Sequence, residues 1–377
     1  MEPELHKAPS RFYEIDLLRF LAALAVLIFH YTYRAWAEHD FSPVRYPELG
    51  RVTRYGFLGV QLFFIISGYV VLLSAHGKTV QQFFISRVKR LYPAFWVACP
   101  LTFVVVRLWG PVPGTVGWST SLDVNIRELV LNLTMLHSFM GIEDLDSSYW
   151  SLAPEICFYF LITLVISWNL YHSLPWMLAL WLAYSAFSGP TSGMFAFTYL
   201  FQPTHAPFFV AGMVFYMLQN NWFNRWTLYG LLVGAFLLAL RSVRAEIAGL
   251  HIFFRDPNFS FTVAAAAVTL FFGVFLLIIN RVINFERYTW LGHLGALTYP
   301  LYLVHGSIGF VIYQRVGDRL DKYVLFGLLV LLMLSLAYAI HLIEKRYSKL
   351  LGDQTAKLLA YLSGKKDLQP TVASLNR

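Results

Sequence analysis

Apolar stretches long enough to cross a lipid bilayer recur along nearly the whole of this 377-residue chain. Only 13% of the residues are charged and 58% are hydrophobic, whereas a soluble domain carries about 25% charged residues. A segment that crosses a bilayer must satisfy its own backbone hydrogen bonds, which leaves helices or closed barrels. Barrel strands are short and alternate in polarity, so these long apolar runs predict an all-α, polytopic membrane protein.

We expect about ten transmembrane helices, which divide the chain into a leader at 1–14, a transmembrane domain at 15–345 and a tail at 346–377. The predicted spans are 15–36, 56–75, 94–109, a fourth that begins at 149, 174–188, 203–219, 226–240, 260–280, 291–313 and 322–343. Ten spans put both termini on one side. Lys and Arg favour that side, chiefly through the seven between Lys345 and Arg377, so the positive-inside rule makes leader and tail cytoplasmic.

The net charge of +8 does not indicate a nucleic-acid partner, because the basic residues lie mostly between and after the spans. Positive-inside topology and anionic membrane lipids account for them. The two cysteines, Cys99 and Cys157, lie inside predicted spans and offer no disulfide framework. The scattered histidines lack the spacing of metal ligands, so we infer no metal site.

The first span carries Asp16, Arg19 and His30 in an otherwise apolar stretch. Such groups are costly at membrane depth and usually face a bundle interior or a water-filled cavity. Arg19 and His30 share one helix face, about 16 Å apart along the axis, and Asp16 lies one turn earlier. Two alternatives stay open: Asp16 and Arg19 snorkel to the interface, or His30 is a structural histidine bonded to a neighbouring helix.

With cytoplasmic termini, Arg19 lies near the inner end of the first span and His30 near its outer end. Glu155 enters the fourth span from outside, at about the depth of His30. An imidazole titrates near neutrality and can accept a proton from a hydroxyl. Glu155 could orient it or act as the base itself. The alternative is that Glu155 is a solvated charge at the entrance of the span.

A basic cluster, Arg87, Lys89 and Arg90, lies in a predicted cytoplasmic loop between residues 76 and 92. Guanidinium groups make paired, charge-assisted bonds to phosphate, so the cluster suits an anionic ligand. Topology alone would also produce such a loop. Together with the pair of His30 and Glu155, the cluster suggests that an anionic donor binds from inside and reacts within the membrane.

Other polar groups are more ambiguous. Ser67 with Gly68 forms a small pair inside a helix, which more often marks close packing than a nucleophile. His305 in the ninth span is expected to face the bundle. His137, with Asn132 and Thr134, could line the outer mouth or form only a polar rim.

Five motifs in order resemble the acyltransferase-3 family of integral membrane acyltransferases, which are mostly bacterial. They cover about 15–345 and are, in order, Arg19 and His30 with ten residues between them, Phe63-Phe-Ile-Ile-Ser-Gly-Tyr69, Arg87-Val-Lys-Arg-Leu-Tyr-Pro93, Trp150-Ser-Leu with Glu155 and Tyr159, and Leu301-Tyr-Leu-Val-His305. Each motif is weak by itself. Their common order makes the resemblance specific.

The resemblance implies about ten transmembrane helices in the bacterial inner membrane. It also implies transfer of an acyl group, commonly acetyl, from cytoplasmic acyl-CoA to a hydroxyl of a cell-envelope glycan or lipid-linked sugar, without a metal. His30 would be the catalytic base or acyl carrier and Glu155 its partner, while Arg19, Arg87 and Arg90 would contact acetyl-CoA or another acyl-CoA. Further substrate contacts are expected from Asp16, Ser67, Trp150, Tyr159 and His305.

The sequence is also compatible with several alternatives. Some family members acylate small secreted metabolites such as macrolides. Others carry a fused extracytoplasmic hydrolase-like domain, for which we expect this tail to be too short, so the chain would act alone or with a separate partner protein. A proton-coupled transporter or flippase would also place polar residues inside spans, but no internal repeat or paired broken helices are evident in the sequence.

Overall fold

The computed structural model describes residues 12–38, 41–188 and 195–363, and its secondary structure across these ranges is helical without a strand. The α-helices are α1 Tyr13–Phe29, α2 Ala35–Ala37, α3 Pro47–Thr53, α4 Gly59–Ala75, α5 Val80–Trp109, α6 Ile126–Asn132, α7 Leu152–Ser167, α8 Leu174–Phe187, α9 Phe195–Phe201, α10 Ala206–Gln219, α11 Arg225–Phe253, α12 Phe261–Ile279, α13 Leu291–Val304, α14 Ser307–Val316 and α15 Lys322–Leu362. A π-helical turn, His30–Arg34, joins α1 to α2, and short 3-10 turns cover Arg54–Leu58, Thr120–Leu122, His137–Met140, Tyr149–Ser151 and Leu170–Ser173. The all-α prediction is confirmed.

Seven helical stretches of the described chain are long and apolar enough to cross a bilayer, or eight if the bent pair α13–α14 counts as one span. The other two predicted spans correspond to α8 and α10, which have 14 residues each. At 1.5 Å per residue such a helix rises about 21 Å, short of the roughly 30 Å hydrocarbon core. Residues 1–11 of the predicted leader and 364–377 of the predicted tail lie outside the described residues.

Several helices extend beyond their predicted limits. The basic segment predicted as a loop belongs to α5, which begins just after Thr79. The Thr79 hydroxyl oxygen accepts from the Gln82 amide, and the Gln82 side-chain oxygen accepts from the Thr79 amide, so the pair caps the start of the helix. Arg87 and Arg90 therefore lie on a helix. Likewise α15 runs to Leu362, and a Cβ at Gly352 would lie 2.4 Å from the Lys89 side chain of α5, so the two helices are in close contact there.

The centre of the bundle is a close crossing of α4 and α10. Every residue of α10 from Ala206 to Leu218 is buried. A Cβ at Gly68 would lie 2.1 Å from the Phe209 carbonyl oxygen, and one at Gly212 would lie 2.0 Å from that of Ile65. The small pair predicted for packing thus lets two backbones touch. The glycines explain why such a short helix can occupy the core.

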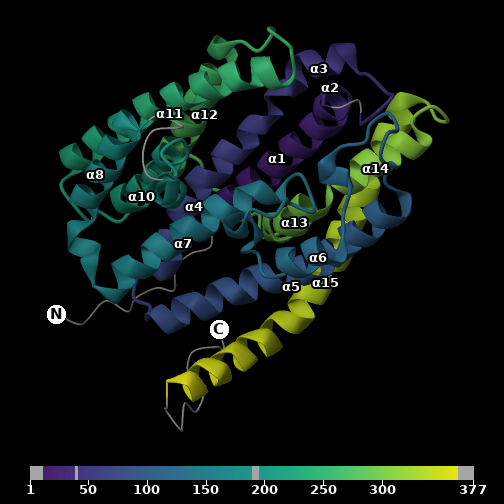
Figure 1. The fold of residues 1–377 in the computed structure, drawn as a ribbon. Helices are drawn as coiled ribbons and strands as arrows, with labels where there is room; N and C mark the ends of the chain where they lie inside the picture. The colour runs from purple at the N-terminus through teal and green to yellow at the C-terminus, as the bar shows by residue number, and fades with distance from the viewer. Residues whose placement is uncertain (1–11, 39–40, 189–194, 364–377) are drawn as a thin grey trace.

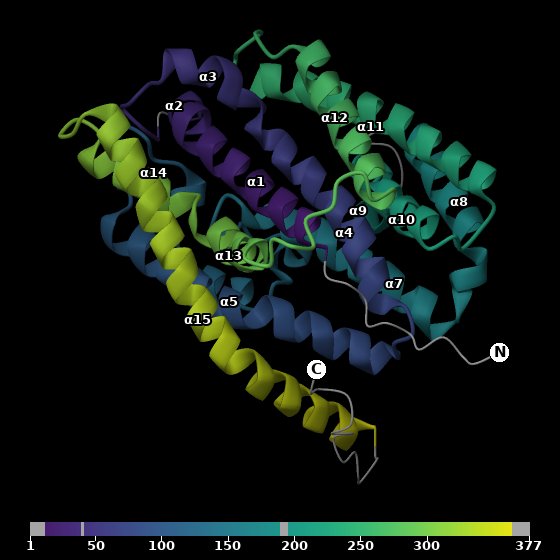
Figure 2. The same ribbon diagram turned by 180° about the vertical axis from the view of Figure 1, so that it is seen from behind.

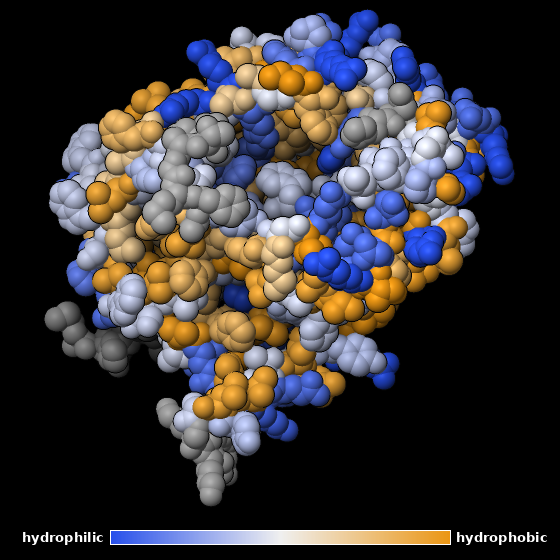
Figure 3. Space-filling model, viewed as in Figure 1, coloured by the Kyte–Doolittle hydropathy of each residue, from blue (hydrophilic) through white to orange (hydrophobic). Residues whose placement is uncertain are grey.

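Two groups of helices flank α1 and α4. Figures 1 and 2 show α8, α10, α11 and α12 on one side, and α5, α13, α14 and α15 on the other. The α1 helix packs against both α4 and α13. Apolar side chains are spread over much of the surface in Figure 3, and many hydrophilic ones gather along its upper edge. This distribution is that of an integral membrane protein.

Candidate active site

His30 lies where α1 changes from an α-helix to a π-helical turn, and its side chain is 4% exposed. Such turns are rare overall, and those that occur are often found at functional sites. The ring atom Nε2 lies 3.2 Å from an Arg34 guanidinium nitrogen, and Arg34 also pairs with Glu38. Arginine only donates, so Nε2 accepts, and the proton of the neutral ring is on Nδ1. In the described part of the chain Nδ1 has no partner.

The imidazole of His305 stacks on that of His30, with ring centroids 4.7 Å apart. His305 lies between α13 and α14, which bend by 64° at this break. Its Nδ1 donates to the Tyr302 carbonyl oxygen at 2.8 Å. The stack therefore joins the end of the first helix to a broken helix near the end of the chain.

The polar backbone groups at this break find partners in other segments. Tyr31 donates its hydroxyl proton to the His305 carbonyl oxygen at 2.8 Å, and Ser148 and Tyr149 donate to the carbonyls of residues 302 and 303 at 3.0 and 3.1 Å. Unpaired backbone groups are costly in a membrane, so a break needs such partners. The predicted span at 291–313 therefore consists of two helices with a bend of 64° between them, and these contacts stabilise the break.

Asp146 fastens the segment that holds the break. Its carboxylate accepts from the amide and hydroxyl of Ser148, at 2.9 and 2.7 Å, and from the Ser307 amide at 2.8 Å. A Cβ at Gly306 would lie 2.3 Å from it, so only glycine allows this approach. The side chain is fully buried, and this burial raises the pKa of Asp146 to about 6.

A hollow rich in arginine opens beside this region. We call it the arginine hollow. Its polar lining comes from α1, α4, α5, α7, α13 and the turn before α7, namely Arg19, Ser67, Arg87, Arg90, Ser151, Glu155, Tyr159, Thr298, Tyr299 and Tyr302. Three guanidinium groups and one carboxylate give it an excess of positive charge.

Hydrogen bonds and ring contacts hold the arginine hollow in shape. Glu155 accepts from the hydroxyls of Tyr159 and Ser67 at 2.5 and 3.2 Å. The Arg87 guanidinium lies 5.4 Å from the centre of the Tyr159 ring and donates to the Ser74 hydroxyl at 3.1 Å. Arg87 is thus positioned by a ring and a hydroxyl, so its charge is available to an anion.

A second hollow, which we call the histidine hollow, is lined by His30. Its polar lining residues are His30, Arg34, Ser148, Trp150, Glu246 and Tyr302. Glu246 on α11 accepts a hydrogen bond of 2.5 Å from the Gln61 amide of α4. Arg34, Glu246 and Gln61 were not among the site residues predicted from the sequence. The signal for Glu246 was a carboxylate close to the predicted span at 226–240. That span was predicted to end too early, because α11 extends to Phe253.

The two hollows adjoin, because Val60 and Tyr302 line both of them. The Tyr302 hydroxyl shares a hydrogen bond of 2.8 Å with Ser151, and its ring lies 5.4 Å from that of His305. The side chains of Val60 and Tyr302 thus lie between the arginine hollow and the hollow that contains His30.

The predicted site residues divide between these places. The arginine hollow brings together six of them, Arg19, Ser67, Arg87, Arg90, Glu155 and Tyr159. The histidine hollow takes His30 and Trp150, with His305 stacked behind His30. Asp16 lies apart, buried against Gly295 of α13. His30 and Glu155, which were predicted to act as partners, line different hollows, and each has other hydrogen-bond partners.

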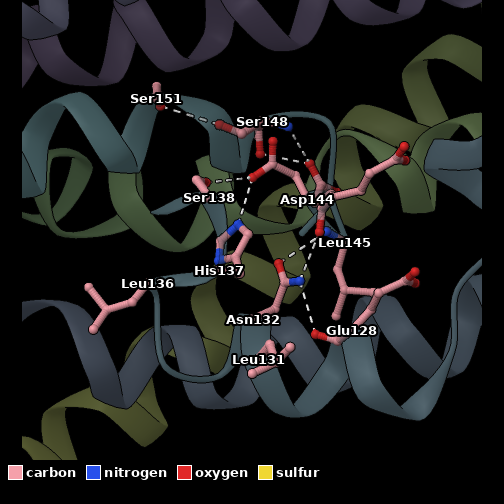
Figure 4. Close-up of polar contacts among 12 residues, drawn as sticks. Glu128, Leu131, Asn132, Leu136, His137, Ser138, Asp144, Leu145, Ser148 and Ser151 are labelled. Atoms are coloured by element: carbon pink, nitrogen blue, oxygen red, sulfur yellow. Dashed lines mark hydrogen bonds and ion pairs between the residues drawn. The ribbon is translucent and has the colours of Figure 1, made fainter. Parts of the chain in front are cut away.

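The connection before α7 does not carry His137 into either hollow. Figure 4 shows His137 and Ser138 pointing at Asp144, with a distance of 2.7 Å between His137 Nε2 and the carboxylate. Asn132 donates to two backbone carbonyls and accepts from the Leu145 amide at 3.1 Å. Both side chains therefore hold the connection together. Within the described residues, no cluster of three or more metal-ligating side chains occurs.

The helices and hollows define an integral membrane protein with a cationic hollow next to a buried histidine. A family model described as an acyltransferase domain, Acyl_transf_3, matches residues 12–342. The chain therefore belongs to this family of acyltransferases.

Two curated relatives are similar over part of the chain. Acyltransferase MdmB of Streptomyces mycarofaciens is 28% identical over 179 residues, which are 46% of this chain and 43% of the relative. Peptidoglycan O-acetyltransferase OatA of Listeria monocytogenes is 30% identical over 157 residues, 38% of this chain and 22% of the relative. The matched stretches thus cover less than half of either relative. No solved structure matches the chain.

Proposed function

We propose that the protein transfers an acyl group, acetyl in the first instance, from acyl-CoA to a hydroxyl of a cell-envelope glycan or lipid-linked sugar. The observation that carries this proposal is the pair of adjoining hollows, one cationic and one containing His30, with Val60 and Tyr302 between them. Transfer needs a site for an anionic donor, a site for an acceptor and a base where they meet.

The donor site is the arginine hollow. Acyl-CoA carries several phosphate groups, and guanidinium groups bind phosphate through paired, charge-assisted hydrogen bonds. Arg19 of α1 and Arg87 and Arg90 of α5 line this hollow together with Glu155 and Tyr159. With both termini in the cytoplasm, as the distribution of Lys and Arg favours, the donor enters from the cytoplasmic face of a bacterial inner membrane.

The acceptor site is the histidine hollow, where His30 acts as the general base. Arg34 donates to Nε2 of His30, so Nε2 is the basic nitrogen, and an acceptor hydroxyl takes the place of Arg34 there. The acceptor oxygen bonds to the carbonyl carbon of the thioester while its proton passes to Nε2. The carbon–sulfur bond then breaks, and the coenzyme A thiolate takes the proton from His30.

The class of acceptor is inferred from the family and from a relative that is named as a peptidoglycan O-acetyltransferase. In this proposal Glu155 helps to shape the arginine hollow, since its hydrogen-bond partners are Tyr159 and Ser67. His305 supports the imidazole of His30 from behind by ring stacking.

The test uses purified protein in nanodiscs with radiolabelled acetyl-CoA and extracted envelope glycans and lipids. We expect His30→Ala to bind acetyl-CoA normally but to lose transfer, and Arg90→Ala to raise the KM for acetyl-CoA. His172→Ala and Arg127→Ala, which alter exposed residues, are the matched controls and should behave as wild type.

Three outcomes separate the possibilities. Transfer by His30→Ala at the wild-type rate contradicts the proposal. Wild-type protein that neither binds acetyl-CoA nor releases coenzyme A also contradicts it and favours transport or another donor. Label that stays on the protein when no acceptor is present, and is lost in His30→Ala, identifies His30 as an acyl carrier instead of a base.

A further inference from the structure

The histidine hollow holds a carboxylate that the chemistry above does not use. Glu246 lines this hollow from α11, together with His30 and Trp150. A carboxylate at membrane depth is costly and is usually paired or functional. In the part of the chain that the structure describes, its one hydrogen-bond partner is the Gln61 amide, 2.5 Å away. No ion pair neutralises it there.

A cation is close in sequence and is not recruited. Arg244 lies two residues before Glu246, and its guanidinium stacks on the Phe261 ring, 4.4 Å from the ring centre. Residues two apart do not share a helix face, so Glu246 points to the hollow and Arg244 elsewhere. Arg244 therefore does not neutralise the Glu246 carboxylate.

Gln61 is placed to hold this carboxylate. It is 1% exposed, and its amide nitrogen donates to Glu246 while its own oxygen has no partner in the described chain. An unpaired buried acceptor costs free energy. The Gln61 amide group is nevertheless oriented so that its nitrogen donates to Glu246. A carboxylate offers about four acceptor positions, and Gln61 occupies one of them.

The rest of the lining suits a ring with apolar faces and hydroxyl edges. Trp150 is 37% exposed, and Phe253 and Phe254 line the same hollow. Binding sites of this kind combine apolar and aromatic walls with a few polar groups that fix orientation. The C–H faces of a sugar ring pack on aromatic rings, and its hydroxyls are donors that a carboxylate accepts.

We propose that Glu246, positioned by Gln61, accepts a hydrogen bond from a second hydroxyl of the acceptor while His30 acts on the first. Glu246 is an acceptor-binding residue and takes no part in proton transfer. It restricts the acceptor to polyhydroxylated molecules of the sugar class. This inference rests on the proposed function, because it assumes that the histidine hollow receives the acceptor.

The test compares Glu246→Gln with wild type in nanodiscs. The probes are acetyl-CoA with methyl N-acetyl-β-D-glucosaminide and with its 3-, 4- and 6-deoxy analogues. A site built around a hydroxyl rejects the analogue that lacks it. One of the analogues that wild type still acylates should show a kcat/KM about tenfold or more lower than that of the parent sugar. Acetyl-CoA binding is measured separately, so that failure of the donor site is recognised on its own.

For Glu246→Gln we expect the KM for the parent sugar to rise about tenfold or more, which is the scale of a hydrogen bond to a charged group. The kcat and the KM for acetyl-CoA should stay within about twofold of wild type, and the variant should no longer distinguish the parent sugar from that analogue. Glu48→Gln, which makes the same change at an exposed position of α3, should match wild type.

Each other outcome overturns the inference. Discrimination that persists in Glu246→Gln contradicts it, as does a fall in kcat with an unchanged acceptor KM. Wild type that binds and turns over acetyl-CoA but acylates none of these sugars excludes the sugar class. If Glu246→Gln does not bind acetyl-CoA, Gln61→Met removes the positioning donor instead and must raise the acceptor KM. An unchanged KM in that variant also contradicts the inference.

Discussion

The imidazole rings of His30 and His305 stack with their planes inclined by 21° and their centroids 4.7 Å apart. One ring belongs to the turn after the first helix, and the other to the break between α13 and α14. The break is held by Tyr31 and by the segment around Asp146. The orientation of His30 therefore depends on three segments that are far apart in the sequence.

The stack predicts that ring shape matters more than ring chemistry at residue 305. We expect His305→Ala to lower kcat about tenfold or more, because His30 loses the ring that fixes its plane. His305→Phe should retain most of the activity. The Tyr302 carbonyl oxygen keeps its bond to Ser148 in either variant, so no acceptor is left unpaired. Steady-state kinetics check this, and equal activity of both variants would contradict it.

Asp146 predicts a pH dependence of stability. Its folded-state pKa, raised to about 6 by burial from an ordinary 3.8, means that the folded protein holds the proton more tightly than the unfolded chain. The stabilisation is present below about pH 4 and is lost as the pH rises to about 6. Two pKa units correspond to about 3 kcal/mol at most.

Asp146→Asn isolates this contribution. The melting temperature of wild type in detergent should fall more steeply between pH 4 and pH 6 than that of the variant. The Asp146→Asn variant should be less stable overall, because its side-chain amide donor would face the Ser307 amide or the Ser148 donors. Parallel pH profiles for the two proteins would refute the assignment.

Tyr302 predicts a link between transfer and wasteful hydrolysis. Its ring is part of the wall between the two hollows, so Tyr302→Ala should let water reach the thioester. We expect coenzyme A release without acyl transfer to increase several-fold relative to transfer. Tyr302→Phe keeps the ring and loses only the bond to Ser151, which is worth about 1 kcal/mol. A similar hydrolysis ratio in all three proteins would count against a separating wall.

The crossing of α4 and α10 predicts a position that tolerates no side chain. A Cβ at Gly212 would lie 2.0 Å from the Ile65 carbonyl oxygen, so Gly212→Ala must force the two backbones apart. We expect a loss of about 2–3 kcal/mol or failure to fold. Gly230→Ala on α11 has open space around the new methyl group and should gain about 0.5–1 kcal/mol. Thermal unfolding in detergent compares them, and equal melting temperatures would rule out the tight crossing.

Several features of the fold and site followed from the sequence. Long apolar runs predicted the helical membrane class, because a bilayer allows few other solutions. The polar line on the first span marked Arg19 and His30, and the basic cluster marked Arg87 and Arg90. All four line the two hollows. Costly groups in apolar helices are visible in a sequence, since nothing local explains them.

Tertiary structure decided which of these groups meet. Glu155 lines the arginine hollow and not the one with His30, and Arg34, Glu246 and His305 surround the imidazole or its hollow. Periodicity reports which face of a helix is polar. It does not report which neighbour that face meets, because helix crossings depend on distant contacts such as Gly68 with Gly212, and helix breaks depend on partners such as Asp146. The sequence determined the chemical groups, and packing between remote segments determined their arrangement.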